Sequence, residues 1–541
     1  MRPPGVLVRG RRWIVPKRWE RLQRLCRNWT LKIGNYGIYR KHIGVLCAIL
    51  GFDQEGGTMA YRYGEDRGQM MALPPTLDQY VSQENPVRAY DAFVEALDFH
   101  ELGIQLDERK VGNSEYDPRA MLKLLLYGYS YGVKSSRKLE REVHNNLSFI
   151  WLMKQMKPDF KTIAEFRRKN KAALGKALSL CARLCLKLGL IEGNIVFVDG
   201  TKMRASAGRG NLHKEKWYQE KLKEIDERIQ RILQECEQVD QSESQCGSFV
   251  KMPKELGQAQ RLKQSIENAL EEFAQCGEQT RKERKVNRVD LDSVLLKGRQ
   301  GTHCGYNMQN VVDDKFGLIV RTEVVSESND LNQLAAQIHG AEADLGTECK
   351  VGCGDAGYWD ITEIAKVESD KTKVVVPTPT QASRREIGPF EKSRFTYDAL
   401  SDSYLCPAGR RLIFRRLKEK EQQKEYRIDQ RKHCRTCPNF GVCTKNKQGR
   451  TITRHVLEDV AEAVSKRYEE PEFRKIYERR KARIEHTFGF IKKILGFGQF
   501  SLRGRAGAQA EASIIATCFN CRRMITLLGG VRGFIQAIGV V

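Results

Sequence analysis

The spacing of apolar residues predicts a helical region between Asn85 and Leu190. Asp117-Pro118 marks the start of an apolar helix, which Gly132 ends, and Ser135 or Ser136 can cap a second, basic helix over residues 137–147. A helix, a short turn and a basic helix are typical of helix-turn-helix DNA-binding units, although most helix pairs of this kind bind no DNA. The region is therefore a candidate for DNA binding.

Two further signals belong to the end of this region. Thr162 and Glu165 have the spacing of a capping box, which predicts that a helix begins there. The next helix carries one apolar stripe, made of Leu174, Leu178, Cys181, Cys185 and Leu188. Cysteines in such a stripe are core residues in preference to metal ligands.

Short apolar runs replace the helical spacing after Asn194. Ile195–Val198 predicts a buried strand that delivers Asp199 at its C-terminal end, followed by Gly200. Another short strand ends in Gly352-Cys353-Gly354-Asp355. Further strands are expected over residues 305–312, 318–325 and 373–376, with a helix from about Asp330. This order predicts a mixed α/β sheet.

Two insertions and two late helices complete the pattern. Residues 207–300 are highly charged, and their apolar residues recur at about 3.5 spacing, which predicts a helical hairpin similar to a coiled coil. Residues 390–450 are basic and rich in cysteine. A long helix is expected from about Glu472 to Leu495, and a last one over residues 506–528 with Cys518 and Cys521 on its core face.

The composition of the chain indicates a polyanionic binding partner. Hydrophobic residues make up 40% and charged residues 30% of the 541 residues, as in globular proteins. The net charge of +25 points to DNA or RNA. The sequence contains no signal peptide and no apolar run of about 18 residues, so we expect a cytoplasmic protein with reduced thiols and no membrane partner.

Two carboxylates have the context of a metal-dependent phosphodiester site. Asp199 and Asp355 both end apolar strands beside glycine, so both can project from the same edge of one sheet. Mg²⁺ prefers oxygen ligands, and two or three carboxylates on a rigid scaffold suffice to hold the ions that activate a phosphodiester. The alternative is a pair of ordinary strand-end turn acids, because Asp-Gly is a common turn dipeptide.

A third carboxylate can come from the helix over residues 472–495. Lys481, Glu485 and Lys492 lie on one line of this helix, beside its buried stripe. An acid flanked by bases suits a metal next to phosphates. The alternative is a surface ion pair between Lys481 and Glu485.

Four cysteines have the spacing of a zinc site. Cys406, Cys434, Cys437 and Cys443 lie in a polar segment rich in glycine and proline, and four thiolates suit tetrahedral Zn²⁺. His433 is an alternative fourth ligand. The other possibility is four reduced structural cysteines without a metal.

At these residues the chain resembles the DDE transposases of bacterial insertion sequences. It is similar above all to the eleven-eighty-two group, within the class related to insertion sequences four and five. The resemblance runs almost continuously from Met59 to Leu528. It is carried by the segments YGEDRGQMMALPPTLDQYVSQENPVRAYDAFVEAL, YDPRAMLKLLLYGYSYGVKSSRKLEREVHNNLSFIWL, FVDGTKMRASA, GYNMQNVVDDKFGLIV, GDAGY, YLCPAGRRL, RIEHTFGFIK and LRGRAGAQAEA.

The resemblance implies an RNase H-like fold and a Mg²⁺ or Mn²⁺ triad at Asp199, Asp355 and Glu485. The tyrosine–arginine–glutamate–lysine signature of the family falls on Tyr477, Arg480, Glu485 and Lys492, which makes Tyr477, Arg480 and Lys492 candidates for DNA binding. The gap between Arg480 and Glu485 is one residue longer than the consensus. Lys492 would contact phosphate near the cut end.

The implied activity is DNA transposition, in which an element end is cleaved and its 3′-hydroxyl attacks target DNA. We expect a homodimer on transposon-end and target DNA, associated with the nucleoid and without a small-molecule substrate. A catalytically silent transposase-derived DNA-binding protein and a nuclease without strand transfer are the alternatives. The expected domains are a helix-turn-helix-like all-α domain (59–190), an RNase H-like catalytic domain (191–528) with insertions at 207–300 and 390–450, and a tail (529–541).

Residues 1–58 differ from the rest of the chain. They hold 12 Lys and Arg against 3 Asp and Glu, and three of the six tryptophans, Trp13, Trp19 and Trp29. The resemblance has no counterpart upstream of Met59. We therefore expect the working protein to begin at Met59, with a disordered basic arm that grips DNA as the alternative.

Overall fold

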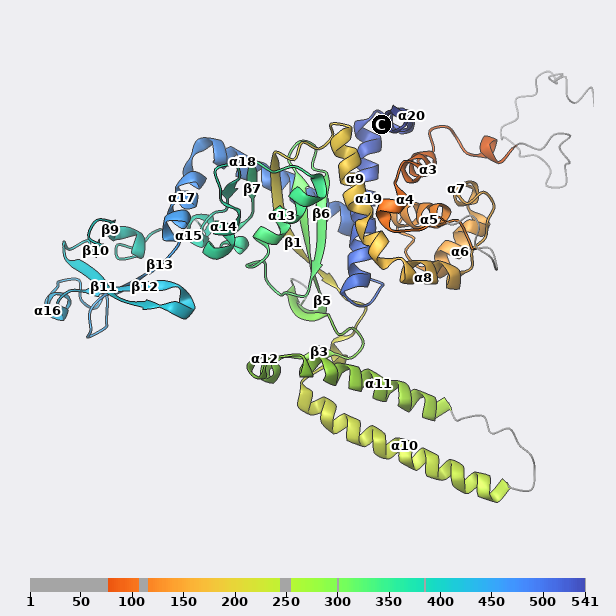
Figure 1. The fold of residues 1–541 in the computed structure, drawn as a ribbon, viewed down its shortest axis with the longest axis horizontal. Helices are drawn as coiled ribbons and strands as arrows, with labels where there is room; N and C mark the ends of the chain where they lie inside the picture. The colour runs from red at the N-terminus through yellow and green to blue at the C-terminus, as the bar shows by residue number, and fades with distance from the viewer. Residues whose placement is uncertain (1–75, 107–114, 244–253, 299–300, 384–385, 541) are drawn as a thin grey trace, which may run out of the picture. The chain divides into compact units, whose positions relative to one another are not determined.

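The computed structural model describes residues 76–540 apart from 107–114, 244–253, 299–300 and 384–385 (Figure 1). The chain divides into two units, residues 1–74 and residues 75–541, and all described residues belong to the second. The expectations for residues 1–58 and for a start at Met59 therefore lie outside the described residues.

The first part of this unit is helical, as predicted. Asp117 caps α5, since its side chain accepts from the Arg119 backbone N–H at 2.8 Å. The capping box at Thr162 is wrong: Asp159 caps α8 and accepts from Thr162 N at 2.7 Å, because its carboxylate lies one residue before the first helical turn. The elements are η2 (Leu77–Tyr80), α3 (Val87–Glu95), α4 (Phe99–Leu102), α5 (Pro118–Ser130), α6 (Ser136–Asn145), α7 (Leu147–Leu152), α8 (Phe160–Lys169) and α9 (Lys171–Lys187).

A mixed sheet follows. Its strands are β1 (Ile195–Arg204), β4 (Val294–Gly298), β5 (Gly301–Asp313), β6 (Ile319–Val325), β7 (Val351–Cys353) and β8 (Lys373–Val375). Strand β5 pairs antiparallel with β1, β4 and β6, whereas β7 pairs parallel with β1 and β8. Strand β1 does not end at Asp199 as predicted but continues to Arg204, because β5 lies beside it over its whole length.

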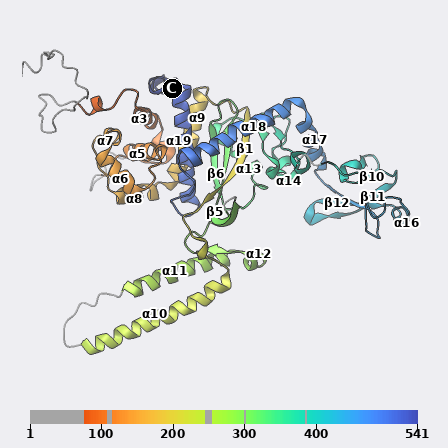
Figure 2. The same cartoon turned by 180° about the vertical axis from the view of Figure 1, so that it is seen from behind.

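Helices cover both faces of the sheet (Figures 1 and 2). Helix α13 (Leu334–Leu345) lies on one face, where Ile338 packs against Gly352 of β7. Helix α18 (Pro471–Gly489) lies on the other and leads into a π-helical turn, η7 (Phe490–Ile494).

Helix α19 (Arg505–Leu527) protects the edge of strand β6. The Asn520 amide donates to the Ile319 carbonyl at 2.8 Å and accepts from its N–H at 2.9 Å. The Gln509 amide likewise donates to the Thr322 carbonyl and accepts from the Val324 N–H. The edge strand therefore presents few free backbone groups for unwanted pairing.

The helical region and the sheet share one continuous core, which extends from Val81 to Ile538. Tyr129 of α5 donates to Glu511 of α19 at 2.8 Å, and both side chains are fully buried. Cys518 and Cys521 are buried in this core, as their stripe predicted. Residues 529–541, expected to be a tail, instead contain helix α20 (Val531–Val540), whose Phe534 is fully buried.

We predict that a fragment ending at Leu190 will not fold by itself. Its helices α5 and α9 bury their apolar faces against α19, so cutting after Leu190 exposes that surface to water. Thermal unfolding followed by circular dichroism is expected to show no cooperative transition for residues 75–190, whereas residues 75–541 show one. A cooperative transition of the fragment would contradict the shared core.

The first insertion is a helical hairpin of α10 (Glu215–Glu243) and α11 (Lys254–Ala274), as predicted. It has its own small core, which includes Tyr218, Ile266 and Phe273. The short elements around it and around the sheet are η3 (Arg209–Asn211), β2 (Leu212–His213), α12 (Glu278–Glu283), β3 (Val286–Asn287), η4 (Ala356–Tyr358), α14 (Ile361–Val367) and α15 (Pro379–Ser383).

The second insertion is a five-stranded antiparallel sheet in the order β13-β12-β11-β10-β9. Its elements, and the helix that leads back to α18, are η5 (Lys392–Arg394), β9 (Thr396–Asp398), β10 (Ser403–Leu405), β11 (Arg411–Lys418), η6 (Glu419–Glu421), β12 (Gln423–Ile428), α16 (Arg431–Arg435), β13 (Thr451–His455) and α17 (Glu458–Glu469). Among the described residues no single helix is long and apolar enough to cross a membrane; only the bent pair α19 and α20, taken together, meets that criterion.

Candidate functional site

Strand pairing brings Asp199 and Asp355 to equivalent positions. The parallel ladder between β1 and β7 ends with Phe197 opposite Cys353, and each aspartate lies two residues beyond that pair. Asp355 begins the turn η4, where its Oδ1 accepts from Gly357 N at 2.8 Å. The prediction that two strands deliver these acids to one region of one sheet agrees with this geometry.

The surroundings of Asp199 disfavour its charge. Burial raises the pKa of this carboxyl to about 6, Arg480 opposes that rise, and the nearby charges of Asp355 and Asp330 add to it. The Asp199 carboxylate is ionised at neutral pH but at a cost, because it is poorly solvated and two further acids lie near it. A cation bound there would reduce the cost.

Arg480 supplies part of the opposing charge. Its Nη1 lies 3.2 Å from Asp199 Oδ2, and its side chain is only 11% exposed. The guanidinium also lies 5.5 Å from the ring centre of Tyr477, which packs edge-on against Tyr468. In this structure Arg480 therefore contacts Asp199 itself, in addition to any contact with DNA that the resemblance implies.

Replacing Arg480 by glutamine will destabilise the metal-free protein more at pH 8 than at pH 5. Arg480 lowers the pKa of Asp199, so its loss moves that pKa further above the unfolded value of 3.8. At pH 5 the Asp199 carboxyl is mostly protonated in both folded proteins. Above pH 6 only the wild type ionises readily, so the stability of the variant falls further as pH rises.

Thermal melts in a chelator at both pH values measure this difference, with Arg479→Gln as a control, since Arg479 pairs with Asp314 instead. An equal loss of stability at pH 5 and pH 8 for Arg480→Gln would show that the Arg480–Asp199 pair does not have this role.

Of the two charged residues predicted at the C-terminal end of α18 and in the turn after it, Lys492 contacts strand β1 and Glu485 does not. Lys492, in the π-helical turn, donates to Thr201 Oγ1, two residues beyond Asp199 on β1. The Glu485 side chain is exposed and, among the described residues, has neither a hydrogen-bond nor an ion-pair partner, so the alternative pair with Lys481 is not formed. The structure does not bring Glu485 against the two aspartates, and within the described ranges no group of three or more His, Cys, Asp or Glu is arranged to hold a metal.

Sequence analysis missed a buried polar network beside the acids. Asp330 Oδ1 accepts from Asn307 Nδ2 at 2.7 Å and from Gln309 Nε2 at 2.6 Å, and the Tyr358 hydroxyl donates to Gln309 Oε1. A sequence signal for this network existed: Asn307 and Gln309 alternate with apolar residues in a strand that is buried on both faces, and buried amides need hydrogen-bond partners.

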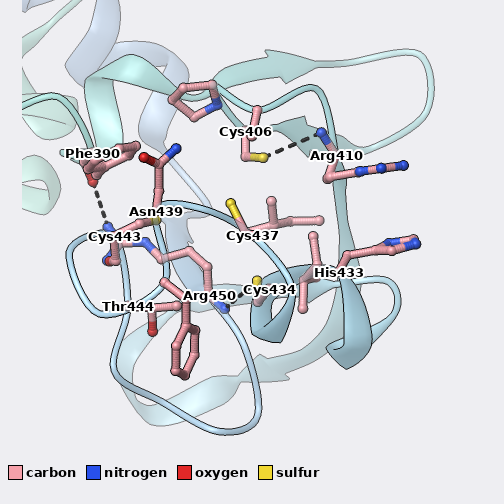
Figure 3. A pocket seen from close by; sticks show the side chains of 15 residues that line it. Phe390, Cys406, Arg410, His433, Cys434, Cys437, Asn439, Cys443, Thr444 and Arg450 are labelled. Atoms are coloured by element: carbon pink, nitrogen blue, oxygen red, sulfur yellow. Dashed lines mark hydrogen bonds between the residues drawn. The ribbon is translucent and has the colours of Figure 1, made fainter.

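The four predicted zinc-binding cysteines lie around one small cavity in the second insertion (Figure 3). Two of the sulfurs accept backbone N–H groups at 3.4 Å, Cys406 from Arg410 and Cys434 from Arg450. The pKa of the Cys443 thiol is raised, by burial first, and the other three cysteines add to the rise. His433, the alternative ligand, also lines the cavity.

Two segments of the chain match known protein families. Residues 405–525 match a family model described as "Transposase DDE domain", and residues 75–169 match one described as "Transposase domain (DUF772)". The first segment contains Arg480, Glu485 and Lys492 but neither aspartate. These matches support a DNA-cleaving transposase of the DDE type, of the kind that insertion sequences encode.

Among solved structures, the chain is similar to the piggyBac transposase synaptic complex with hairpin DNA, determined by cryo-electron microscopy. The identity is 8% and the TM-score 0.29, over 84% of this chain and 79% of that one. No curated protein matches the chain.

Proposed function

We propose that this protein is a transposase of the eleven-eighty-two group of bacterial insertion sequences, which binds the terminal inverted repeats of its element and catalyses strand cleavage and strand transfer. The observation that carries the proposal is the position of Asp199 and Asp355, each two residues beyond the end of one parallel ladder. The sheet, an antiparallel β6-β5-β1 meander continued by parallel β7 and β8, supports the RNase H-like assignment.

The acids fit a divalent cation such as Mg²⁺ or Mn²⁺. Both are hard oxygen donors, and burial, the first cause of the raised pKa of Asp199, leaves its carboxylate with little water to stabilise the charge. When bound, such ions activate the attacking hydroxyl and stabilise the leaving oxygen of a phosphodiester. Arg480, already ion-paired with Asp199, is placed to compensate the acids when no cation is present.

Basic side chains beside the acids suit the DNA backbone. Lys492 reaches β1 at Thr201, so its ammonium can hold a phosphate within reach of Asp199. Arg480 of α18 pairs with Asp199, and Tyr477 lies beside the Arg480 guanidinium. The protein would act as a homodimer on transposon-end and target DNA, in the cytoplasm and on the nucleoid.

Glu485 is the proposed third acid, and its exposed position also keeps one alternative open. It lies on α18, seven residues before Lys492 of the π-helical turn, and the proposal requires that α18 rotate on DNA to bring Glu485 toward the aspartates. A silent DNA-binding derivative would keep Glu485 outside the site.

A DNA-cleavage assay distinguishes an active transposase from a silent DNA-binding derivative. The protein is incubated with a plasmid that carries its gene and the native flanking DNA, in Mg²⁺ or in a chelator, and new 3′ ends are mapped. A transposase produces metal-dependent ends at the borders of inverted repeats. Repeat-specific binding without any new ends would favour the silent derivative.

A structural zinc ion is the second part of the proposal. The thiols of Cys406, Cys434, Cys437 and Cys443 line one cavity, and two of the sulfurs accept backbone N–H groups, which suits thiolate ligands. Among the described residues the four are not arranged around one metal position, so binding of the ion would draw the thiols together. The ion would hold the loop between β12 and β13 against the turn after β10 and would take no part in the chemistry.

A further inference from the structure

The ladder that aligns the two aspartates stops before it reaches them. Beyond Phe197 and Cys353, no backbone hydrogen bond joins β1 to β7 among the described residues. Side-chain contacts between the elements that carry Asp199 and Asp355 can therefore add to what the backbone ladders fix.

The side chain of Gln309 connects strand β5 with the turn that follows β7. Gln309 of β5 stands opposite Gly200, next to Asp199, and is fully buried. Its Nε2 donates to Asp330 at 2.6 Å, which fixes the amide so that Oε1 faces the Tyr358 hydroxyl and accepts from it. An amide held by a carboxylate on one side and a hydroxyl donor on the other has one satisfied orientation.

Tyr358 connects this amide to the Asp355 turn. It is the last residue of η4, its N–H donates to Asp355 O at 3.1 Å, and its ring is fully buried. A Cβ placed on Gly354 would lie 3.3 Å from the Tyr358 ring, so the turn packs closely on the tyrosine.

Gly200 leaves the space for this connection. A Cβ at this position would lie 2.4 Å from both Gln309 Nε2 and Asp330 Oδ1. Any side chain there would push the amide away from Tyr358. A glycine at position 200 is therefore required by the hydrogen bonds that join Gln309 to Asp330 and Tyr358.

We propose that Asp330, Gln309 and Tyr358 form a positioning relay that holds the Asp355 turn at a set distance from Asp199. The relay rests on the proposed function, in which these two acids bind the catalytic cation. Its members need not touch the cation: they act through Asp355, as outer-shell partners of metal ligands do.

Tyr358→Phe tests the relay, because it removes one hydroxyl and keeps the buried ring. Tyr306→Phe is the matched control: Tyr306 is also fully buried, lies on β5 three residues from Gln309, and donates to a carboxylate, Asp290, away from the Asp355 turn. Amide hydrogen exchange over residues 354–358 and calorimetric titration of Mn²⁺ into the metal-free protein are measured for both.

We expect Tyr358→Phe to exchange about 10-fold faster over this turn and to bind Mn²⁺ about 10-fold more weakly, with end-DNA binding unchanged. Tyr306→Phe should change neither, even if it loses as much thermal stability. Gly200→Ala is the second variant, for use if Tyr358→Phe folds poorly. Its added Cβ breaks the same network from the side of β1, so it should show the same faster exchange and weaker Mn²⁺ binding.

Exchange within twofold of the wild type in both Tyr358→Phe and Gly200→Ala would overturn the relay. Faster exchange with unchanged Mn²⁺ affinity would support the relay and would instead contradict Asp355 as a cation ligand. The exchange measurement thus separates the relay from the proposed function.

Discussion

Replacing Asp199 or Asp355 by asparagine will abolish DNA cleavage and leave end binding nearly intact. Each variant keeps the size of the side chain, and in Asp355→Asn the amide oxygen can still accept from Gly357 N. What is lost is a charged cation ligand, worth several kcal/mol in the transition state, so we expect a rate loss of about 1,000-fold. Phosphate contacts by Lys and Arg are unaffected.

The control is Asp360→Asn in the same loop. Asp360 caps α14 by accepting from Thr362 and Glu363, and asparagine caps helices equally well. This variant should cleave at the wild-type rate. Rates are measured as product formed per unit time in Mg²⁺, with binding followed by gel shift. Near wild-type cleavage by Asp199→Asn or Asp355→Asn would remove that residue from the site.

The double variant Cys434→Ser/Cys437→Ser will lose zinc and unfold the second insertion. The core of that insertion is small, with six buried residues, Tyr404 and Tyr426 among them. A four-thiolate zinc site contributes on the order of 10 kcal/mol to folding, more than so small a core can replace. Elemental analysis should find about one zinc per wild-type chain and almost none in the variant.

Cys236→Ser is the matched control, because Cys236 is a free, half-buried cysteine on α10, outside the second insertion. It should keep its zinc and its resistance to proteolysis over residues 390–455. Absence of zinc from the wild type, or the same zinc content in the double variant, would reject the zinc site.

The paired aspartates could be predicted from sequence because their signals are local. Each follows a short apolar run, and such runs form buried strands whose ends lie together in a parallel pair. The length of β1 could not be predicted in this way. Lys202 and Arg204 look like loop residues, yet they remain in the strand because β5, a hundred residues later, pairs with them.

Glu485 shows the limit of helical periodicity. Its spacing from Lys492 predicts that both residues lie on one line of a regular helix, but α18 ends at Gly489 and Lys492 lies in the π-helical turn at residues 490–494, where that period is interrupted. The relay was missed for a similar reason. Gln309 and Tyr358 are 49 residues apart, and their contact depends on the missing side chain of Gly200.

Strand transfer tests the central claim most directly. A duplex that ends in the terminal repeat of the element, with a free 3′-hydroxyl at the cut position, is incubated with the protein, Mg²⁺ and a supercoiled target plasmid. We predict covalent joining of the labelled 3′ end to the target by the wild-type protein and no joining by Asp199→Asn or Asp355→Asn. Joining that persists in both variants, or its absence from a wild-type protein that binds the repeat and the cation, would contradict the proposal that this chain is a transposase acting through these two acids.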